Sequence, residues 1–111
     1  MRRGDVVIIN FPFSDRSGSK RRPELVVQAD ALNARLHDTV LATITTNRQP
    51  SQTKVLIDVT TDPQSGLHFP CAVKCENLAT VEQSLVLGTI GMLSSATMRK
   101  VDKCLRRVLG V

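Results

Sequence analysis

Short apolar stretches alternate with polar, turn-forming segments along the whole chain of 111 residues. Apolar runs of this length, bounded by Gly, Pro, Asn, Asp and Ser, are typical of β-strands. The pattern predicts strands at residues 5–11, 24–28, 39–46, 54–60, 69–77 and 83–90. Between the second and third strands, Asp30 is expected to cap a short helical segment that ends at Leu36.

The C-terminal segment follows a different period. Apolar residues recur at three- and four-residue spacing between positions 98 and 108, which predicts an amphipathic helix over residues 95–109. Ser94 or Ser95 can cap its start, and Gly110 can end it. Short strands with one terminal helix favour a mainly β fold with a C-terminal α-helix, arranged as a small, strongly bent antiparallel barrel. A chain of this length forms one domain, residues 1–111.

A basic cluster stands directly before the second strand. Residues 13–20 are mostly polar and predict a flexible loop, which ends in Lys20, Arg21 and Arg22. Pro23 then leads into an apolar run, so the three cations are attached to the barrel without a spacer. The cluster is either an anion-binding site or a patch that keeps the surface soluble, and the run of charges does not decide between them.

Composition narrows the choice of partner. The formal net charge is +5 and the isoelectric point is about 9.6, which favours polyanions. Aromatic residues make up only 3% of the chain, so binding of nucleic acid by stacking is not expected. Charge and hydrogen bonds must supply most of any affinity for RNA or DNA.

The three cysteines are an odd number, which predicts free thiols in a reducing, cytoplasmic setting. No apolar run approaches the ~20 residues that cross a bilayer, so no membrane association is predicted. Cys71 and Cys75 lie near His68, but residues four apart on a strand are separated by roughly 13 Å. They cannot share a metal ion on a continuous strand, and we expect them to face the core with Val73.

The opposite face of the same strand carries Lys74 and Glu76, which form either a solvent-facing ion pair or one wall of a groove. Neither His37 nor His68 stands near the basic cluster, so neither is an obvious general base. The chain also lacks a glycine-rich phosphate loop and a nucleophile elbow. Any chemistry is therefore expected to need no metal and no cofactor.

Several motifs in the same order resemble the MazF/PemK/Kid family of toxin endoribonucleases. They are Arg3-Gly4-Asp5-Val6-Val7, then Arg22-Pro23 followed by Leu25-Val26-Val27, Ile44-Thr45, and Val73-Lys74-Cys75-Glu76-Asn77 with Thr80. Gly91 and the terminal helix are also similar, so the likeness covers almost the full length. Two positions depart from the family pattern: Ala79 stands where many members place an arginine, and the first loop lacks a histidine that some members carry.

The resemblance implies an SH3-like barrel that forms a homodimer, cuts single-stranded RNA at short sequences without a metal, and is inhibited by a cognate antitoxin. Residue by residue, it implies catalytic roles for Arg22 and Thr45. Lys74 and Glu76 fall where some members carry an arginine and an aspartate with catalytic roles.

In RNA the 2′-hydroxyl can attack the neighbouring phosphate and leave a cyclic phosphate, so the protein needs no nucleophile of its own. Arg22 suits the stabilisation of the added negative charge, and Thr45 suits the positioning of the reacting oxygens. Glu76 is the predicted base with Lys74 as its electrostatic partner. The residues predicted to bind RNA are Lys20, Arg21, Thr46 and Asn47.

Two other classes of function fit the sequence. One is an SH3-like barrel that binds RNA or a peptide without catalysis, which agrees with Ala79 and the loop without histidine. The other is an antitoxin or transcriptional regulator, which is less favoured because the sequence has no helix-turn-helix pattern and no acidic tail.

Overall fold

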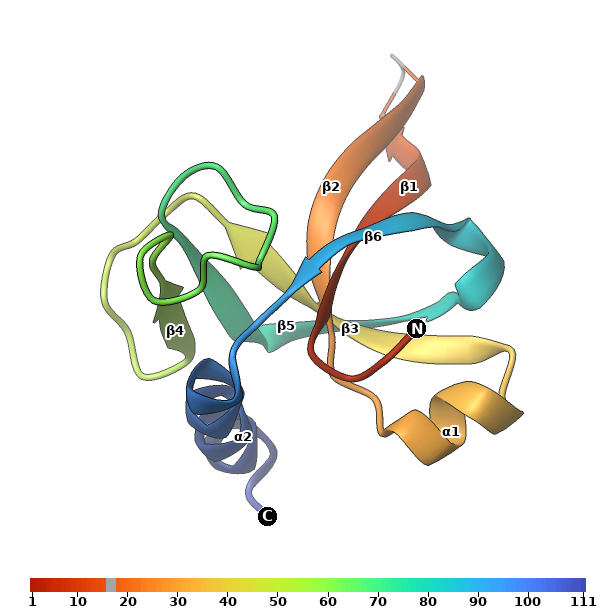
Figure 1. The fold of residues 1–111 in the computed structure, drawn as a ribbon. Coiled ribbons are helices and arrows are strands. Elements are labelled where there is room, and N and C mark those ends of the chain that lie inside the picture. Colours follow the sequence, from red (N-terminus) through yellow and green to blue (C-terminus); the bar gives the residue numbers. More distant parts are fainter. Residues whose placement is uncertain (16–17) are drawn as a thin grey trace.

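The computed structural model describes the backbone of residues 1–15 and 18–111, and the side chains of residues 1–10 and 21–111 (Figure 1). The elements in chain order are β1 Asp5–Asp15, β2 Gly18–Val26, α1 Asp30–Arg35, β3 Asp38–Thr45, β4 Lys54–Ile57, β5 Cys71–Glu82, the 3-10 turn η1 Gln83–Leu85, β6 Val86–Met92 and α2 Ser95–Leu109. The prediction of a mainly β fold with a C-terminal helix is confirmed.

The strands form one six-stranded antiparallel sheet in the order β4-β5-β3-β2-β1-β6. The sheet bends strongly, and the β1–β2 hairpin projects beyond the rest of the molecule (Figure 1). In the described part of the chain β4 and β6 are the two edges and do not pair with each other, so the bent sheet remains open.

Several element boundaries differ from the predicted ones. Residues 13–15 and 18–20, predicted as loop, continue β1 and β2, because the hairpin pairs with itself out to Asp15 and Gly18, whereas residues 16–17 lie outside the described part. The fourth strand ends at Ile57 instead of residue 60, since Asp58 begins a turn by accepting a hydrogen bond from the amide of Thr60.

The fifth strand begins at Cys71, after Pro70, and runs on to Glu82. The sixth begins at Val86 instead of residue 83, because Gln83 starts η1. The side-chain amide of Gln83 donates hydrogen bonds from Nε2 to the carbonyls of Asn33, Leu36 and Asp38. These bonds connect the turn to α1 and to the start of β3.

The apolar face of α2 covers one side of the sheet. Val101, Cys104 and Leu105 pack with Ile44 and Val73 in the larger core cluster. The opposite side of β1, β2 and β3 has a smaller core of Val7, Ile9, Val26 and Leu41, against which residues of β5, η1 and β6 pack. β1 therefore has buried residues on both faces, as its continuous apolar pattern predicts.

The start of α2 is fixed by capping. The hydroxyl of Ser94 accepts a hydrogen bond from the amide of Thr97, and Gly110 ends the helix with φ of 71°. Asp62 is buried beneath this end and accepts hydrogen bonds at 2.6 Å from the Ser94 amide and from the Thr97 hydroxyl. The segment that follows β4 is thereby attached to the helix that covers the core.

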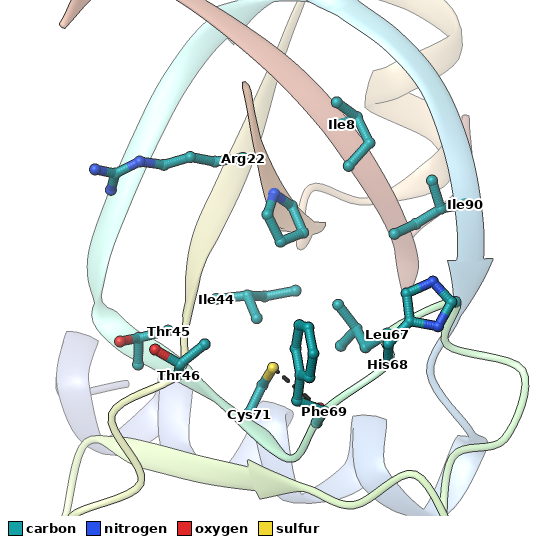
Figure 2. A pocket seen from close by; sticks show the side chains of 12 residues that line it. Ile8, Arg22, Ile44, Thr45, Thr46, Leu67, His68, Phe69, Cys71 and Ile90 are labelled. Carbon is teal, nitrogen blue, oxygen red and sulfur yellow. Dashed lines mark hydrogen bonds between the residues drawn. The ribbon is translucent and has the colours of Figure 1, made fainter. Parts of the chain in front are cut away.

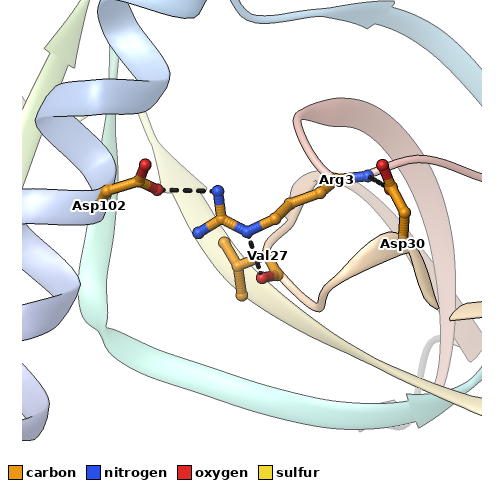
Figure 3. A network of polar contacts seen from close by, with 4 residues as sticks. All are labelled: Arg3, Val27, Asp30 and Asp102. Carbon is orange, nitrogen blue, oxygen red and sulfur yellow. Dashed lines mark hydrogen bonds and ion pairs between the residues drawn. The ribbon is translucent and has the colours of Figure 1, made fainter. Parts of the chain in front are cut away.

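Arg3 connects the N-terminus to both helices (Figure 3). Its amide donates to Asp30 of α1, its Nε donates to the carbonyl of Val27 at 2.8 Å, and its guanidinium forms an ion pair with Asp102 of α2 at 2.8 Å. These contacts give Arg3 a structural role, and Arg3 does not belong to the basic cluster at residues 20–22.

Candidate nuclease site

The site begins where β2 and β3 separate. Their pairing is limited to three residues, Glu24–Val26 against Leu41–Thr43. Pro23, which has no N–H to donate, stands at the point where the pairing ends. Directly opposed residues of antiparallel strands share a face, so Arg22 and Thr45, each two residues beyond the Glu24–Thr43 pair, lie on one face at the two sides of this split.

A cavity of about 440 Å³ occupies the split (Figure 2). Its lining residues are Ile8, Arg22, Pro23, Ile44, Thr45, Thr46, Gly66, Leu67, His68, Phe69, Cys71 and Ile90. In Figure 2 the guanidinium of Arg22 points away from Phe69, and the hydroxyls of Thr45 and Thr46 lie towards the same side as the guanidinium. The cavity thus has a polar side formed by these three residues and an apolar floor.

The opposite wall is a loop held close to β6. Gly66 has φ of 76°, and a Cβ there would lie 2.2 Å from the carbonyl oxygen of Ile90. A Cβ on Gly91 would lie equally close to the carbonyl oxygen of Gln64, so both glycines permit this approach. The loop places His68 and the exposed ring of Phe69 in the cavity.

Sequence reasoning did not assign His68 to the site, because its position depends on how this loop folds back onto β6. Its ring packs edge-on against Phe69, with 6.4 Å between the ring centroids. In Figure 2 the imidazole lies across the cavity from Arg22. A titratable group therefore shares the cavity with the candidate phosphate-binding arginine.

Glu24 is the second residue that sequence reasoning missed. Its side chain is only 4% exposed, and burial raises its pKa to about 7, although the Ile44 amide, the Arg22 cation and Thr43 each act to lower it. The Ile44 amide donates to Glu24 Oε2 at 3.3 Å, so the carboxyl connects β2 to the segment that carries Thr45. The available signal was strand alternation, which puts Glu24 on the same buried face as Val26.

Thr45 starts an ordered turn. Its Oγ1 accepts a hydrogen bond from the Asn47 amide at 3.1 Å, and Asn47 Oδ1 accepts one from the Gln49 amide at 3.0 Å. The Nζ of Lys54 donates to the Asn47 carbonyl at 3.2 Å. Thr46 lines the cavity as its predicted role requires, whereas Asn47 lies outside the described lining and uses its side chain within the turn.

Lys74 and Glu76 are separated by an irregularity in β5. Ala42 opposes Leu78 but Thr43 opposes Lys74, so Cys75, Glu76 and Asn77 form a bulge. Lys74 is half-buried on the same face as Thr43, and Glu76 is exposed in the bulge. Neither lines the described cavity, and the structure of residues 1–10 and 21–111 shows no ion pair between them.

The other two predicted RNA contacts are on β2. Arg21 is exposed but is not among the residues that line the cavity. Lys20 is paired with Phe11 in the hairpin, and its side chain falls outside the described residues. Of the eight predicted site residues, the structure therefore brings Arg22, Thr45 and Thr46 together in one cavity.

The cysteines belong to the core. Cys71 and Cys75 are buried with Val73, as the strand alternation predicts, and no disulfide joins any of the three thiols. Burial and the neighbouring Cys104 raise the pKa of Cys75 to about 12. Among the described residues, no group of three or more His, Cys, Asp or Glu side chains could hold a metal ion. No described helix is long and apolar enough to cross a bilayer.

Residues 2–109 match the family model described as the PemK-like, MazF-like toxin of type II toxin-antitoxin systems. "Endoribonuclease MazF6" of Mycobacterium tuberculosis is 33% identical over 101 residues, covering 88% of this chain and 86% of that protein. "Probable endoribonuclease MazF" of Mycolicibacterium smegmatis is 27% identical, covering 100% and 98%. A mycobacterial endoribonuclease solved with its cognate antitoxin superimposes with a TM-score of 0.83 at 25% identity, covering 100% of this chain and 96% of that one. The chain belongs to the PemK/MazF family of toxins of type II toxin-antitoxin systems.

Proposed function

We propose that this protein is a toxin endoribonuclease that cuts single-stranded RNA, mRNA included, at short sequences by attack of the 2′-hydroxyl on the adjacent phosphate, in the cytoplasm and without a metal or cofactor. The observation that supports this function most directly is the shared cavity of Arg22 and Thr45. A guanidinium and a hydroxyl on one face are the groups that an in-line phosphoryl reaction needs for charge stabilisation and positioning.

In this mechanism the Arg22 guanidinium donates two hydrogen bonds to the non-bridging oxygens of the phosphate, where negative charge increases. The hydroxyls of Thr45 and Thr46 orient the phosphate and the 2′-hydroxyl. Because Thr45 Oγ1 already accepts from the Asn47 amide, its own proton is directed to another acceptor, such as a phosphate oxygen.

One group must take the proton of the 2′-hydroxyl and one must protonate the leaving 5′-oxygen. His68 is favoured for one of these steps because it is exposed and lines the cavity. Glu76 with Lys74, predicted from the resemblance, can contribute only if the RNA extends from the cavity along β5. His68→Gln and Glu76→Gln distinguish the two: the variant that removes a limb from the pH–rate profile identifies the residue that transfers the proton.

We propose a homodimer that uses the β6 edge. Val6, Val7 and Ile9 of β1 are fully buried within one chain, so they need no partner. On β6, however, Leu87, Ile90 and Met92 are 40–52% exposed. Apolar side chains along an unpaired edge strand favour association with a second chain.

A cognate antitoxin is the second proposed protein partner. The solved mycobacterial relative is in complex with its cognate antitoxin. On this chain, an antitoxin segment that covers Arg22 and Thr45 would exclude RNA by competition for the same cavity.

The test is to incubate the purified protein with mixed-sequence single-stranded RNA in excess chelator and to map the new ends. The expected products carry 2′,3′-cyclic phosphates. Cleavage that requires magnesium would contradict the mechanism. RNA binding without cleavage under any condition would replace the nuclease with the non-catalytic RNA-binding barrel.

A further inference from the structure

A second cationic cavity lies between the edge strand β4 and helix α2, away from Arg22 and Thr45. Its volume is about 360 Å³, and its lining residues are Lys54, Val55, Leu56, Lys100, Lys103, Cys104 and Arg107. Four of these seven carry a positive charge, and none of the described lining residues is acidic. We refer to Lys54, Lys100, Lys103 and Arg107 as the β4–α2 cluster.

The cluster has no structural role that explains all of its charges. Arg107 donates to the carbonyl of Gln52 at 2.6 Å and Lys54 donates to that of Asn47, so these two residues hold the ends of the loop between β3 and β4. Lys100 and Lys103 are exposed and make no hydrogen bond or ion pair within the described structure. Like charges gathered in one place repel each other, which an anionic ligand would relieve.

The cluster adjoins a further lysine, Lys74, that lies near the strand end carrying Thr45 of the nuclease cavity. Across the sheet, Glu24 opposes Thr43, Thr43 opposes Lys74, and Lys74 opposes Lys54. All of these side chains share the face that carries Arg22 and Thr45. Two lysines directly opposite each other are unfavourable in a sheet, yet here Lys74 opposes Lys54 on one side and, on the other, Thr43, which is two residues from Thr45 of the cavity. Lys54 also lines the second cavity together with Lys100 and Lys103, so Lys54 and Lys74 connect that cavity to β3.

We propose that the β4–α2 cluster binds backbone phosphates of the RNA strand that the nuclease cavity cleaves, several nucleotides from the cut bond. This inference rests on the proposed function. RNA is favoured over an acidic polypeptide because Lys54 and Lys74 place positive charge between the cluster and β3, the strand that carries Thr45 of the cavity proposed to hold the reacting phosphate. Contacts of lysines with phosphates carry no sequence information, so the cluster adds affinity and holds the strand in position without reading bases.

The experiment compares two double variants of the full-length protein. Lys100→Gln with Lys103→Gln neutralises two members of the cluster, and neither lysine is in the proposed catalytic machinery. Arg99→Gln with Arg106→Gln removes two charges from the same helix at exposed positions outside the cluster. Both pairs change the net charge equally and preserve helix propensity. Circular dichroism verifies that both variants are folded.

The probes are mixed-sequence single-stranded RNAs of about 5 and about 20 nucleotides. The shorter RNA is close to the smallest number of nucleotides that a small barrel covers, and the longer RNA exceeds the largest. Their riboses carry 2′-O-methyl groups, so they bind without being cut. Anisotropy titrations over a range of salt concentrations give the affinity and its salt dependence.

The cluster variant is expected to bind the longer RNA about tenfold more weakly at low salt, with the slope of log K against log salt reduced by about 1.4 for two lost phosphate contacts. The affinity of the cluster variant for the short RNA is expected to equal that of the wild type. The control variant is expected to bind both RNAs as tightly as the wild type does. Equal losses in the two variants, or no loss in the cluster variant, would overturn the proposal. Cleavage of unmodified RNA by the wild type tests the nuclease function separately. A failure of the phosphate-binding proposal therefore does not imply a failure of the proposed nuclease function, and the reverse also holds.

Discussion

Glu24 allows a quantitative test of how the cavity is built. Its carboxyl is buried between Arg22 and the segment that leads to Thr45, and its pKa is raised from 4.5 to about 7. Because the folded pKa lies above the unfolded one, the unfolded state releases the proton first as the pH rises. The stability that protonated Glu24 provides is therefore complete below pH 4.5 and is lost as the pH rises through about 7.

The size of the effect follows from the two pKa values. One pKa unit corresponds to about 1.4 kcal/mol, so the full shift lowers the free energy of unfolding by about 3 kcal/mol at alkaline pH. Between about pH 5 and about pH 8 the loss from this group is about 2 to 3 kcal/mol. The residue is almost fully buried, so solvent screening reduces this value little.

Glu24→Gln removes the titration and keeps an oxygen that accepts the hydrogen bond from the Ile44 amide. Unfolding by urea, followed by circular dichroism because the chain has no Trp or Tyr, gives the stability at each pH. The wild type is expected to lose about 2 to 3 kcal/mol more than the variant over this pH range. Parallel pH dependence in the two proteins would refute the burial of an ionisable carboxyl next to Arg22.

Four further predictions follow from the described contacts. Arg22→Gln removes the nearby cation that lowers the pKa of Glu24, so the loss of stability should shift to higher pH in the same urea experiment. In Asp62, burial acts to raise the pKa, but hydrogen bonds from Thr97 and Ser94 outweigh it and hold the pKa below its usual value; Asp62→Ala should lower the free energy of unfolding by about 3 kcal/mol, and unchanged stability would contradict these bonds. Gly66→Ala should cost about 2 kcal/mol or more because of its positive φ and the Ile90 carbonyl, whereas Gly88→Ala, with open space around it, should cost much less; equal losses would contradict the close approach. The Cys75 thiol, with its pKa raised to about 12, should react with a thiol reagent only after unfolding, and rapid labelling of the native protein would contradict its burial.

Sequence patterns correctly predicted the elements whose structure depends mainly on the residues of the element itself. The period from Met98 to Val108 and a cap at Ser94 or Ser95 predicted α2 with its correct bounds, because the helix is defined by its own amphipathic face. Alternation placed Cys71 and Cys75 in the core for the same reason.

Features that depend on contacts distant in sequence were not predictable in this way. The bulge at Glu76 arises from the register of β5 against β3, and only the folded-back loop at Gly66 brings His68 into the cavity. The mostly polar residues at 13–15 and 18–20 indicated a loop, yet they belong to strands β1 and β2. Arg22, Thr45 and Thr46 were found because two of them lie in motifs of the family and the third is adjacent.

The most direct test of the central claim is the rate of RNA cleavage by Arg22→Gln compared with Arg21→Gln, measured under single-turnover conditions in chelator. The two variants lose the same charge at neighbouring exposed positions of β2, but only Arg22 lines the cavity with Thr45. We predict that Arg22→Gln cleaves about 100-fold more slowly or worse, whereas Arg21→Gln stays within a few-fold of the wild type. Equal rates for folded Arg22→Gln and wild-type protein would contradict the assignment of the guanidinium to the reacting phosphate.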